Sequence, residues 1–524
     1  MQTNESKSPE TKDAFSQRLK VLSSALSIKA KRLLIEILLW FKEAIILLLI
    51  LLKFITIQLY RLTQRLLIKL FQLIVIRREK RAIAAAVITI LICVISTFKC
   101  TNSEWTIESD LKATRDWYKE QSINFLLDNQ MSGLEQTKKF DSTIEAFMKR
   151  WELTGGSFAL MRNDSLIYAK GYGYADKESG VLCNVQNVFR IASASKLITA
   201  TAAMKLIEEG KMKLTSKVFG EEGILRDTTF LKFSNKSFKE ITVEHLLRHT
   251  SGLSSPISDP SFANYSVARH LGKELPLSLD DMVLYATTIR VKYKPGTRYE
   301  YSNLGYQILT KVIEVVADED YEKFVQRELL EPAKCYDMYV GKNFREDRDP
   351  NEVNYYEVKE AKPVDAYDGS GRKVMKSNGG NNVTLLSGAG GWVASPVELL
   401  RFVASINGNS GKADVISKES VNKMTYDSTD RTKKPMGWAT VKGREWQRSG
   451  SMAGTNTFIK QQKDGYTWVF ITNSSAWIGY QLSSKISSTI TTAIGRVKEW
   501  PKRDLFEAES RKEYSTSTTI AEAE

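Results

Sequence analysis

The chain has 524 residues, of which 42% are hydrophobic and 10% aromatic. This composition is ordinary for a globular protein and argues against disorder throughout. The net charge of +14 would suggest a nucleic-acid partner, but it is unevenly distributed. Residues 1–100 hold 17 Lys and Arg against 6 Asp and Glu, a net +11, so the other 424 residues carry only +3. A basic, apolar-rich N-terminus before a near-neutral body points to a membrane and not to nucleic acid.

The first hundred residues form the predicted membrane-anchoring region. The clearest transmembrane helix is expected at 82–98, an apolar run preceded by the basic cluster RREKR at 77–81. The positive-inside rule places that cluster in the cytoplasm and the rest of the chain on the far side, which would be periplasmic in a bacterium. Residues 44–60, interrupted by Lys53, form a marginal second span. If they also cross the membrane, the body of the protein would face the cytoplasm.

The body reads as strands at both ends with helices between them. Residues 101–139 are expected to form a linker and a helix, 140–498 a folded domain, and 499–524 a disordered tail. The run GGSFALMRNDSLIYAKGYGYAD predicts two strands joined by a turn at Asn163–Asp164. From Met436 onward MGWATV, EWQRSG, TNTFIKQ and YTWVFITN predict further strands, followed by a helix.

Residues 215–430 are predicted to be mostly helical, with a polar loop over 343–382. These patterns predict an α/β protein of the α+β kind. One antiparallel sheet, completed by both ends of the domain, would be flanked by helices, and the helical insertion would form a second lobe.

Ser193 and Lys196 form a Ser-x-x-Lys pair at the start of a predicted helix in NVFRIASASKLITATAAMKLIEEGK. Residues three apart share a helix face, so the amine would lie beside the hydroxyl. The helix N-terminus supplies free N–H groups and a dipole that favour negative charge on Ser193. For Lys196 to act as a base, its pKa must fall from about 10.4 towards 7, which costs about 4 kcal/mol. The pair alone is weak evidence, because the alternative is a capping serine with a surface lysine.

Tyr301 and Asn303 stand two residues apart in KPGTRYEYSNLGYQIL, between a turn and an apolar helix. A tyrosine and an amide at this spacing can point together into a cleft, one moving protons and the other holding a substrate carbonyl. The order and spacing of FRIASASK, ITVEHLLRHTSGL, PGTRYEYSNLGY, GAGGWVASPVELLRF and RSGSMAGT resemble the serine β-lactamase and penicillin-binding-protein family. The resemblance is greatest to the branch of class C β-lactamases, D-alanyl-D-alanine carboxypeptidases and related esterases, and it covers residues 140–498.

The resemblance implies a β-lactamase/transpeptidase-like fold and a role for each motif residue. Ser193 would be the nucleophile, Lys196 its activating partner and Tyr301 the general base, while Asn303 would contact the substrate. The family's third motif, usually Lys-Thr-Gly or His-x-Gly, corresponds to Arg448-Ser449-Gly450, with Ser451 after it. The N–H groups of Ser193 and Ser451 would form the oxyanion hole.

Arg448 departs from the family pattern. A permanent cation can lower the pKa values of Lys196 and Tyr301 and attract a substrate carboxylate. It cannot titrate, so the sequence favours simple hydrolysis over β-lactamase or carboxypeptidase activity.

Histidines and cysteines give weaker signals. His245 and His249 lie four residues apart, as zinc ligands on a helix do, but no third ligand is evident, so no metal site is predicted. The few histidines and the lack of a G-x-S-x-G motif disfavour a Ser-His-Asp enzyme. Outside the cytoplasm Cys183 and Cys335 can pair, and two unpaired thiols are an equal alternative.

The sequence therefore predicts a membrane-anchored serine hydrolase that cleaves amide or ester bonds through a Ser193 acyl-enzyme. It needs no cofactor, and its partners would be a small-molecule or peptide substrate and the membrane, with no nucleic acid. D-amino-acid peptides, β-lactams and small esters all remain open as substrates. The alternative is an inactive binding or regulatory protein on the same fold.

Overall fold

The computed structural model of the protein describes residues 126–507 apart from 234, 255–258, 410–413, 427–429 and 431. The predicted transmembrane helix at 82–98, the second candidate span and most of the predicted tail lie outside these residues. Within the described part of the chain, no helix is both long and apolar enough to cross a membrane.

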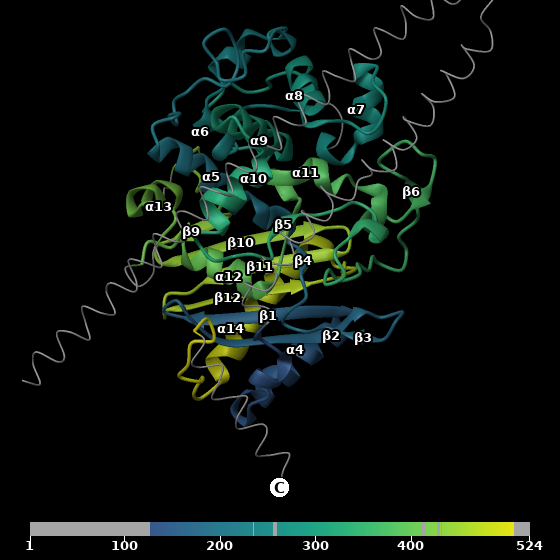
Figure 1. The fold of residues 1–524 in the computed structure, drawn as a ribbon, viewed down its shortest axis with the longest axis vertical. Coiled ribbons are helices and arrows are strands. Elements are labelled where there is room, and N and C mark those ends of the chain that lie inside the picture. Colours follow the sequence, from purple (N-terminus) through teal and green to yellow (C-terminus); the bar gives the residue numbers. More distant parts are fainter. Residues whose placement is uncertain are drawn as a thin grey trace, which may run out of the picture. The chain divides into compact units, whose positions relative to one another are not determined.

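A seven-stranded antiparallel sheet forms the centre of the described fold (Figure 1). Its strands lie in the order β3-β2-β1-β12-β11-β10-β9, so the two ends of the domain meet where β1 pairs with β12 and Phe158 lies opposite Phe470. The strands are β1 (Gly155–Arg162), β2 (Ser165–Asp176), β3 (Val181–Leu182), β9 (Thr440–Lys442), β10 (Glu445–Met452), β11 (Thr455–Gln461) and β12 (Tyr466–Thr472). The predicted sheet, built from both ends of the domain, is confirmed.

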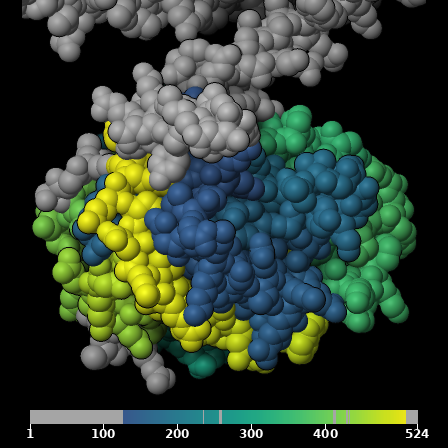
Figure 2. Space-filling model, turned by 90° about the horizontal axis from the view of Figure 1, so that it is seen from below, coloured from purple at the N-terminus to yellow at the C-terminus, as the bar shows by residue number. Residues whose placement is uncertain are grey.

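Two terminal helices cover one face of this sheet. They are α4 (Lys138–Arg150) and α14 (Leu482–Arg496), which Figure 2 shows in blue and yellow, side by side. Isoleucines every four residues give α14 an apolar stripe, and Ile486, Ile490 and Ile494 are all buried. Together with Phe140 and Trp468 they form a core that is separate from the larger core on the other side of the sheet.

The insertion between β3 and β9 carries the helical lobe (Figure 1). Its helices are α5 (Ser195–Glu208), α6 (Val243–Leu247), α7 (Asn264–Leu271), α8 (Leu279–Thr288), α9 (Asn303–Ala317), α10 (Tyr321–Val325), α11 (Val383–Gly390), α12 (Pro396–Ala404) and α13 (Lys418–Met424). A small sheet of β4 (Phe189–Arg190), β8 (Trp392–Ala394) and β5 (Tyr339–Val340) leads into α5. The polar segment 343–382 contains only short turns and the hairpin of β6 (Val364–Asp365) and β7 (Lys373–Val374).

The local predictions differ from the structure in two places. Residues 215–430, predicted to be mostly helical, hold long stretches of turn and loop between their helices, and the first predicted strand of the C-terminal part is shortened at β9. The expected strand MGWATV is reduced to Thr440–Lys442 because the residues before it pack on α5. A Cβ on Gly437 would lie 2.9 Å from Cβ of Ala200, so the backbone passes too close to that helix to join the sheet there. The turn at Asn163–Asp164 is confirmed, with positive φ at both residues. Cys183 and Cys335 are both buried free thiols, so the structure contains the unpaired alternative.

Candidate active site

Ser193 stands on a short turn between β4 and α5. Ala192 before it has φ of +47°, an uncommon value for a residue with a side chain, and residues Ala192–Ala194 form one 3-10 turn that leads into α5. Strand β10 runs directly past this turn. A Cβ on Gly450 would lie 2.4 Å from the carbonyl oxygen of Ile191 and 2.9 Å from the amide nitrogen of Ser193, so only glycine permits the approach. The helix was predicted to begin at Ser193, and α5 begins at Ser195, so the prediction is right to within one turn.

The structure brings Ser193, Lys196, Tyr301 and Asn303 together from two helices and the loop before α9. The Ser193 Oγ lies 2.8 Å from the Tyr301 hydroxyl and 3.4 Å from Lys196 Nζ. Lys196 is fully buried, and its Nζ donates to Asn303 Oδ1 at 2.6 Å and to the carbonyl oxygen of Ala389. Because the ammonium is fixed by three acceptors, the hydroxyls of Ser193 and Tyr301 have a defined position beside it.

Burial and charge move two pKa values of this group toward neutrality. Burial, above all, lowers the pKa of Lys196 to about 8, and the positive charge of Arg448 acts in the same direction. Burial alone would raise the pKa of Tyr301, but the charges of Lys196 and Arg448 outweigh it and lower that pKa to about 8. Both groups can therefore exchange protons near neutral pH, which general acid–base chemistry requires.

Arg448 lies beside Ser193 and Tyr301, on the part of β10 that borders the turn of Ser193. Its Nε donates to the carbonyl oxygen of Ser193 at 2.7 Å, and its Nη2 lies 3.4 Å from the Tyr301 hydroxyl. The residue is only 3% exposed. It is placed to act by its charge on Lys196 and Tyr301, as predicted, whereas its burial gives no support to the expected attraction of a substrate carboxylate.

The rest of the predicted third motif follows Arg448 along β10. Strand β9 pairs with β10 only at Glu445–Gln447. From Arg448 onward this edge of β10 is therefore not paired with β9 and borders the turn that carries Ser193. Ser449 is half-buried and Ser451 is exposed. The expected oxyanion hole of the Ser193 and Ser451 N–H groups stays a prediction.

Asp259, which the sequence analysis missed, extends the network. Its Oδ2 accepts from Asn303 Nδ2 at 2.5 Å, which turns the amide oxygen of Asn303 toward Lys196. Its other oxygen accepts from the backbone N–H of Ser261 and caps the turn that follows. The sequence signal for Asp259 was only that of an Asp-Pro turn.

His249 supports the site from behind, and His245 closes a helix cap. The Nδ1 of His249 accepts from the backbone N–H of Ser302 at 3.2 Å, and its ring centroid lies 4.5 Å from that of Tyr301. His245 Nδ1 accepts from the N–H of Thr242, the N-cap residue of α6. Within the described residues no group of three or more His, Cys, Asp and Glu side chains is arranged to hold a metal ion.

Comparison with known proteins identifies the family of this domain. Residues 140–484, well over half of the chain, match the family model described as Beta-lactamase. The chain belongs to the beta-lactamase family. It is therefore a serine hydrolase of the beta-lactamase type.

One curated relative is similar in sequence to part of this chain. Protein flp of Staphylococcus aureus strain COL is 27% identical over 199 residues, which is 38% of this chain and 37% of that protein. The chain thus spans well under half the length of that curated relative.

Among solved structures, the octameric penicillin-binding protein homologue from Pyrococcus abyssi is 23% identical with a TM-score of 0.51, covering 70% of this chain and 80% of that one. A D-amino acid amidase from Ochrobactrum anthropi SV3 is 19% identical with a TM-score of 0.52, covering 70% and 100%. At these identities the two structures support the shared fold.

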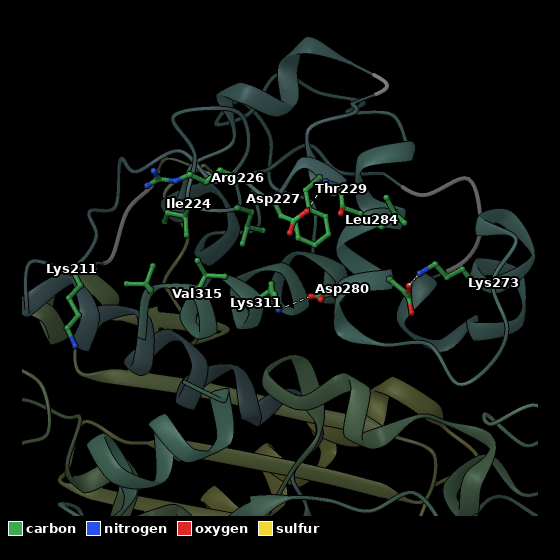
Figure 3. A pocket seen from close by; sticks show the side chains of 14 residues that line it. Lys211, Ile224, Arg226, Asp227, Thr229, Lys273, Asp280, Leu284, Lys311 and Val315 are labelled. Atoms are coloured by element: carbon green, nitrogen blue, oxygen red, sulfur yellow. Dashed lines mark hydrogen bonds and ion pairs between the residues drawn. The ribbon is translucent and has the colours of Figure 1, made fainter. Parts of the chain in front are cut away.

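Two pockets of this beta-lactamase-family domain differ in their relation to Ser193. One, of about 230 Å³, is lined by Tyr301 and Asn303 and so adjoins the candidate site. Another, of about 730 Å³, lies in the helical lobe between Lys211, Arg226 and Lys273 and contains none of the predicted site residues (Figure 3). In it Lys311 pairs with Asp280 at 2.8 Å and Lys273 with Asp281 at 2.6 Å, so those cations are already matched. Of these two pockets, the smaller one is therefore the one that borders predicted site residues.

Proposed function

We propose that this protein is a membrane-anchored hydrolase that cleaves amide or ester bonds through an acyl-enzyme on Ser193. The observation that carries the proposal is the placement of the Ser193 Oγ at 2.8 Å from Tyr301 and 3.4 Å from Lys196. A nucleophile within hydrogen-bond reach of a base that is itself held by a third group is the arrangement that covalent catalysis needs. Because the pKa values of Lys196 and Tyr301 are both about 8, the Tyr301 phenolate can act as the base near neutral pH.

Acylation follows from these contacts. Tyr301, in its phenolate form, takes the proton of Ser193 as the Oγ bonds to the substrate carbonyl carbon, and the positive Lys196 stabilises the phenolate. The carbonyl oxygen becomes an oxyanion that accepts from the N–H groups of Ser193 and Ser451. Tyr301 then gives its proton to the leaving amine or alkoxide as the carbonyl–nitrogen or carbonyl–oxygen bond breaks.

In deacylation water takes the place of Ser193 as the nucleophile, and Ser193 Oγ becomes the leaving group. Water bonds to the acyl carbon while Tyr301 accepts one of its protons, and the bond to Ser193 Oγ breaks as the hydroxyl recovers a proton from Tyr301. Lys196 remains charged beside Asn303 throughout, so the phenolate forms twice against the same cation. Every atom in these steps comes from the substrate, water or the chain's own residues.

Hydrolysis of p-nitrophenyl butyrate by the purified full-length chain tests the nucleophile. We expect Ser193→Ala to lower kcat/KM by at least about a thousandfold, and wild type to release a burst of p-nitrophenol with one equivalent per enzyme. Ser488→Ala, an exposed serine on α14, is the matched control and keeps the wild-type rate. Equal rates in wild type and Ser193→Ala, or no hydrolysis at all, would favour a binding protein on the same fold.

Membrane anchoring and a location outside the cytoplasm are part of the proposal and rest on the sequence. The apolar run at 82–98 and the basic residues at 77–81 support a single span with the hydrolase domain on the far side. In membranes from expressing bacteria, the full chain should resist alkaline carbonate extraction, and deletion of 82–98 should release it. Protease added to spheroplasts should degrade the domain; protection by an intact membrane would place it in the cytoplasm.

A further inference from the structure

A chain of hydrogen bonds lies in the core behind the candidate site and joins α5, α10 and β8. Its side chains are Thr199 of α5, Tyr321 of α10 and Trp392 of β8, each 2% exposed or less. The indole Nε1 of Trp392 lies 3.1 Å from the Tyr321 hydroxyl, which lies 2.7 Å from Thr199 Oγ1. Thr199 Oγ1 in turn donates to the carbonyl oxygen of Gly388 at 2.7 Å. The three side chains thus connect two helices and a strand to one backbone carbonyl.

The two ends of this chain fix the direction of its hydrogen bonds. An indole N–H can only donate, and a carbonyl oxygen can only accept. The Tyr321 oxygen therefore accepts from Trp392, and the Tyr321 proton is donated to Thr199. The other acceptor near Thr199 Oγ1, the carbonyl oxygen of Ser195, is farther away at 3.3 Å. Without the Tyr321 hydroxyl, the Trp392 N–H would be left unpaired in the core and Thr199 could turn its proton toward Ser195.

The carbonyl at the end of the chain is next to one that holds the catalytic lysine. Gly388 directly precedes Ala389, whose carbonyl oxygen accepts from Lys196 Nζ. The segment has an uncommon conformation, with φ of +27° and ψ of −109° at Ser387, and such a conformation persists only where the surrounding structure holds it. A Cβ on Gly388 would lie 2.7 Å from Thr199 Oγ1, so the backbone passes very close to α5. The hydrogen-bond chain is therefore placed to fix the peptide group that contacts Lys196.

We propose that Tyr321 and Thr199 are positioning residues for hydrolysis. They hold the segment whose Ala389 oxygen accepts from Lys196, and in this way they fix the ammonium beside the proposed base. They act through Lys196, because their own hydrogen bonds go to each other, to an indole N–H and to backbone oxygens. The inference rests on the proposed function, since it assigns both residues to the cation that stabilises the Tyr301 phenolate.

Variants that differ from wild type by one hydroxyl test the inference in the full chain. Tyr321→Phe keeps the ring and Thr199→Val keeps the shape of the side chain, and both interrupt the hydrogen bonds. With p-nitrophenyl butyrate we expect kcat to fall about tenfold or more in each, with KM within about twofold of wild type, because Lys196 acts in the chemical step. Thr199→Ser restores the hydroxyl and should recover most of the rate lost in Thr199→Val.

The pH profile distinguishes positioning from a general loss of stability. In Tyr321→Phe the descending limb of kcat/KM should move to lower pH, because an ammonium with a poorly placed acceptor loses its proton more readily. Tyr168→Phe is the matched control: Tyr168 is fully buried and donates to Asp141 at 2.5 Å, in the core on the other face of the sheet. It should lower the Tm and leave kcat and the limb unchanged. A Tyr321→Phe protein with the wild-type kcat and limb would overturn the inference.

A measurement without turnover separates this inference from the proposed function. In protein with isotope-labelled lysine, an NMR titration follows Lys196, whose signal is identified by its absence in Lys196→Arg. A lower titration midpoint in Tyr321→Phe than in wild type supports the positioning of Lys196 even where no ester is hydrolysed, and an equal midpoint overturns it. If the midpoint moves while Ser193→Ala hydrolyses the ester at the wild-type rate, the nucleophile is wrong and the positioning of Lys196 stands.

Discussion

The side chain of Arg448 is bonded to the backbone of Ser193, with Nε donating to the Ser193 carbonyl oxygen at 2.7 Å. The same guanidinium lies beside the Tyr301 hydroxyl. One residue of β10 thus fixes the position of the turn that carries the nucleophile and supplies a permanent positive charge to the proposed base. A titrating lysine or histidine could supply the charge only over part of the pH range.

Removal of this charge should shift the pH dependence of hydrolysis upward. Arg448 lowers the pKa values of both Lys196 and Tyr301, which stand at about 8. In Arg448→Met both pKa values rise, so the ascending limb of kcat/KM for p-nitrophenyl butyrate moves to higher pH than in wild type. Arg448→Lys keeps a positive charge and should move it less. An unchanged limb in Arg448→Met would show that this charge does not set the ionisation.

Loss of Asp259 should move the descending limb of kcat/KM to lower pH. The charge of Asp259 raises the pKa of Lys196, so Asp259→Asn and Asp259→Ala both lower that pKa, and the charged Lys196 that stabilises the Tyr301 phenolate is lost at a lower pH than in wild type. The two variants should differ in kcat, because asparagine still offers an oxygen to Asn303 Nδ2 and alanine does not. We expect kcat to fall about tenfold or more in Asp259→Ala and less in Asp259→Asn. Equal kcat values in both would remove the positioning role of Asp259.

Gly450 should tolerate no side chain. In Gly450→Ala the new Cβ would lie 2.4 Å from the Ile191 carbonyl oxygen, so β10 must move away from the turn of Ser193. The expected result is a large loss of kcat with a Tm lowered by several degrees. Gly495→Ala is the control, because nothing lies within 4 Å of a Cβ at that helix position. It should leave activity unchanged and stabilise slightly, by up to about 1 kcal/mol. A fully active Gly450→Ala would mean that β10 and the turn separate without consequence.

Local patterns were enough for the elements and for the residues of the motifs. The turn at Asn163–Asp164 was predictable because asparagine and aspartate tolerate positive φ between two alternating strands. Ser193 and Lys196 meet because they share one helix, and Tyr301 was found through its motif. That both ends of the domain complete one sheet was predictable from strands at each end with helices between them, whereas the order of the strands was not predicted.

The contacts that tune the site were not predictable in this way. The oxygen of Ala389 reaches Lys196 from a segment 193 residues away, and any residue type supplies a carbonyl oxygen, so the sequence carries no mark of it. Asp259 reads locally as a turn residue, and its bond to Asn303 depends on how the loop before α7 folds back on α9. The hydrogen bond of Arg448 to Ser193 depends on the close approach at Gly450, which only the tertiary structure defines.

His249 should make the folded protein sensitive to acid. Burial, and then the positive charges of Lys196 and Arg448, hold the pKa of His249 well below its usual value. The unfolded chain takes up this proton near pH 6.5 and the folded protein only at lower pH. The stability that the neutral imidazole provides is thus complete above about pH 6.5 and is lost as pH falls from there toward the folded pKa.

The pH dependence of unfolding in denaturant isolates this histidine. His249→Gln does not titrate and still offers an oxygen to the Ser302 N–H, so its free energy of unfolding should fall less steeply below pH 6.5 than that of wild type. The difference in slope should approach one proton, about 1.4 kcal/mol per pH unit. His270→Gln, on the exposed side of α7, should keep the wild-type slope. Parallel slopes for wild type and His249→Gln would mean that the site behind Tyr301 opens enough to admit the imidazolium.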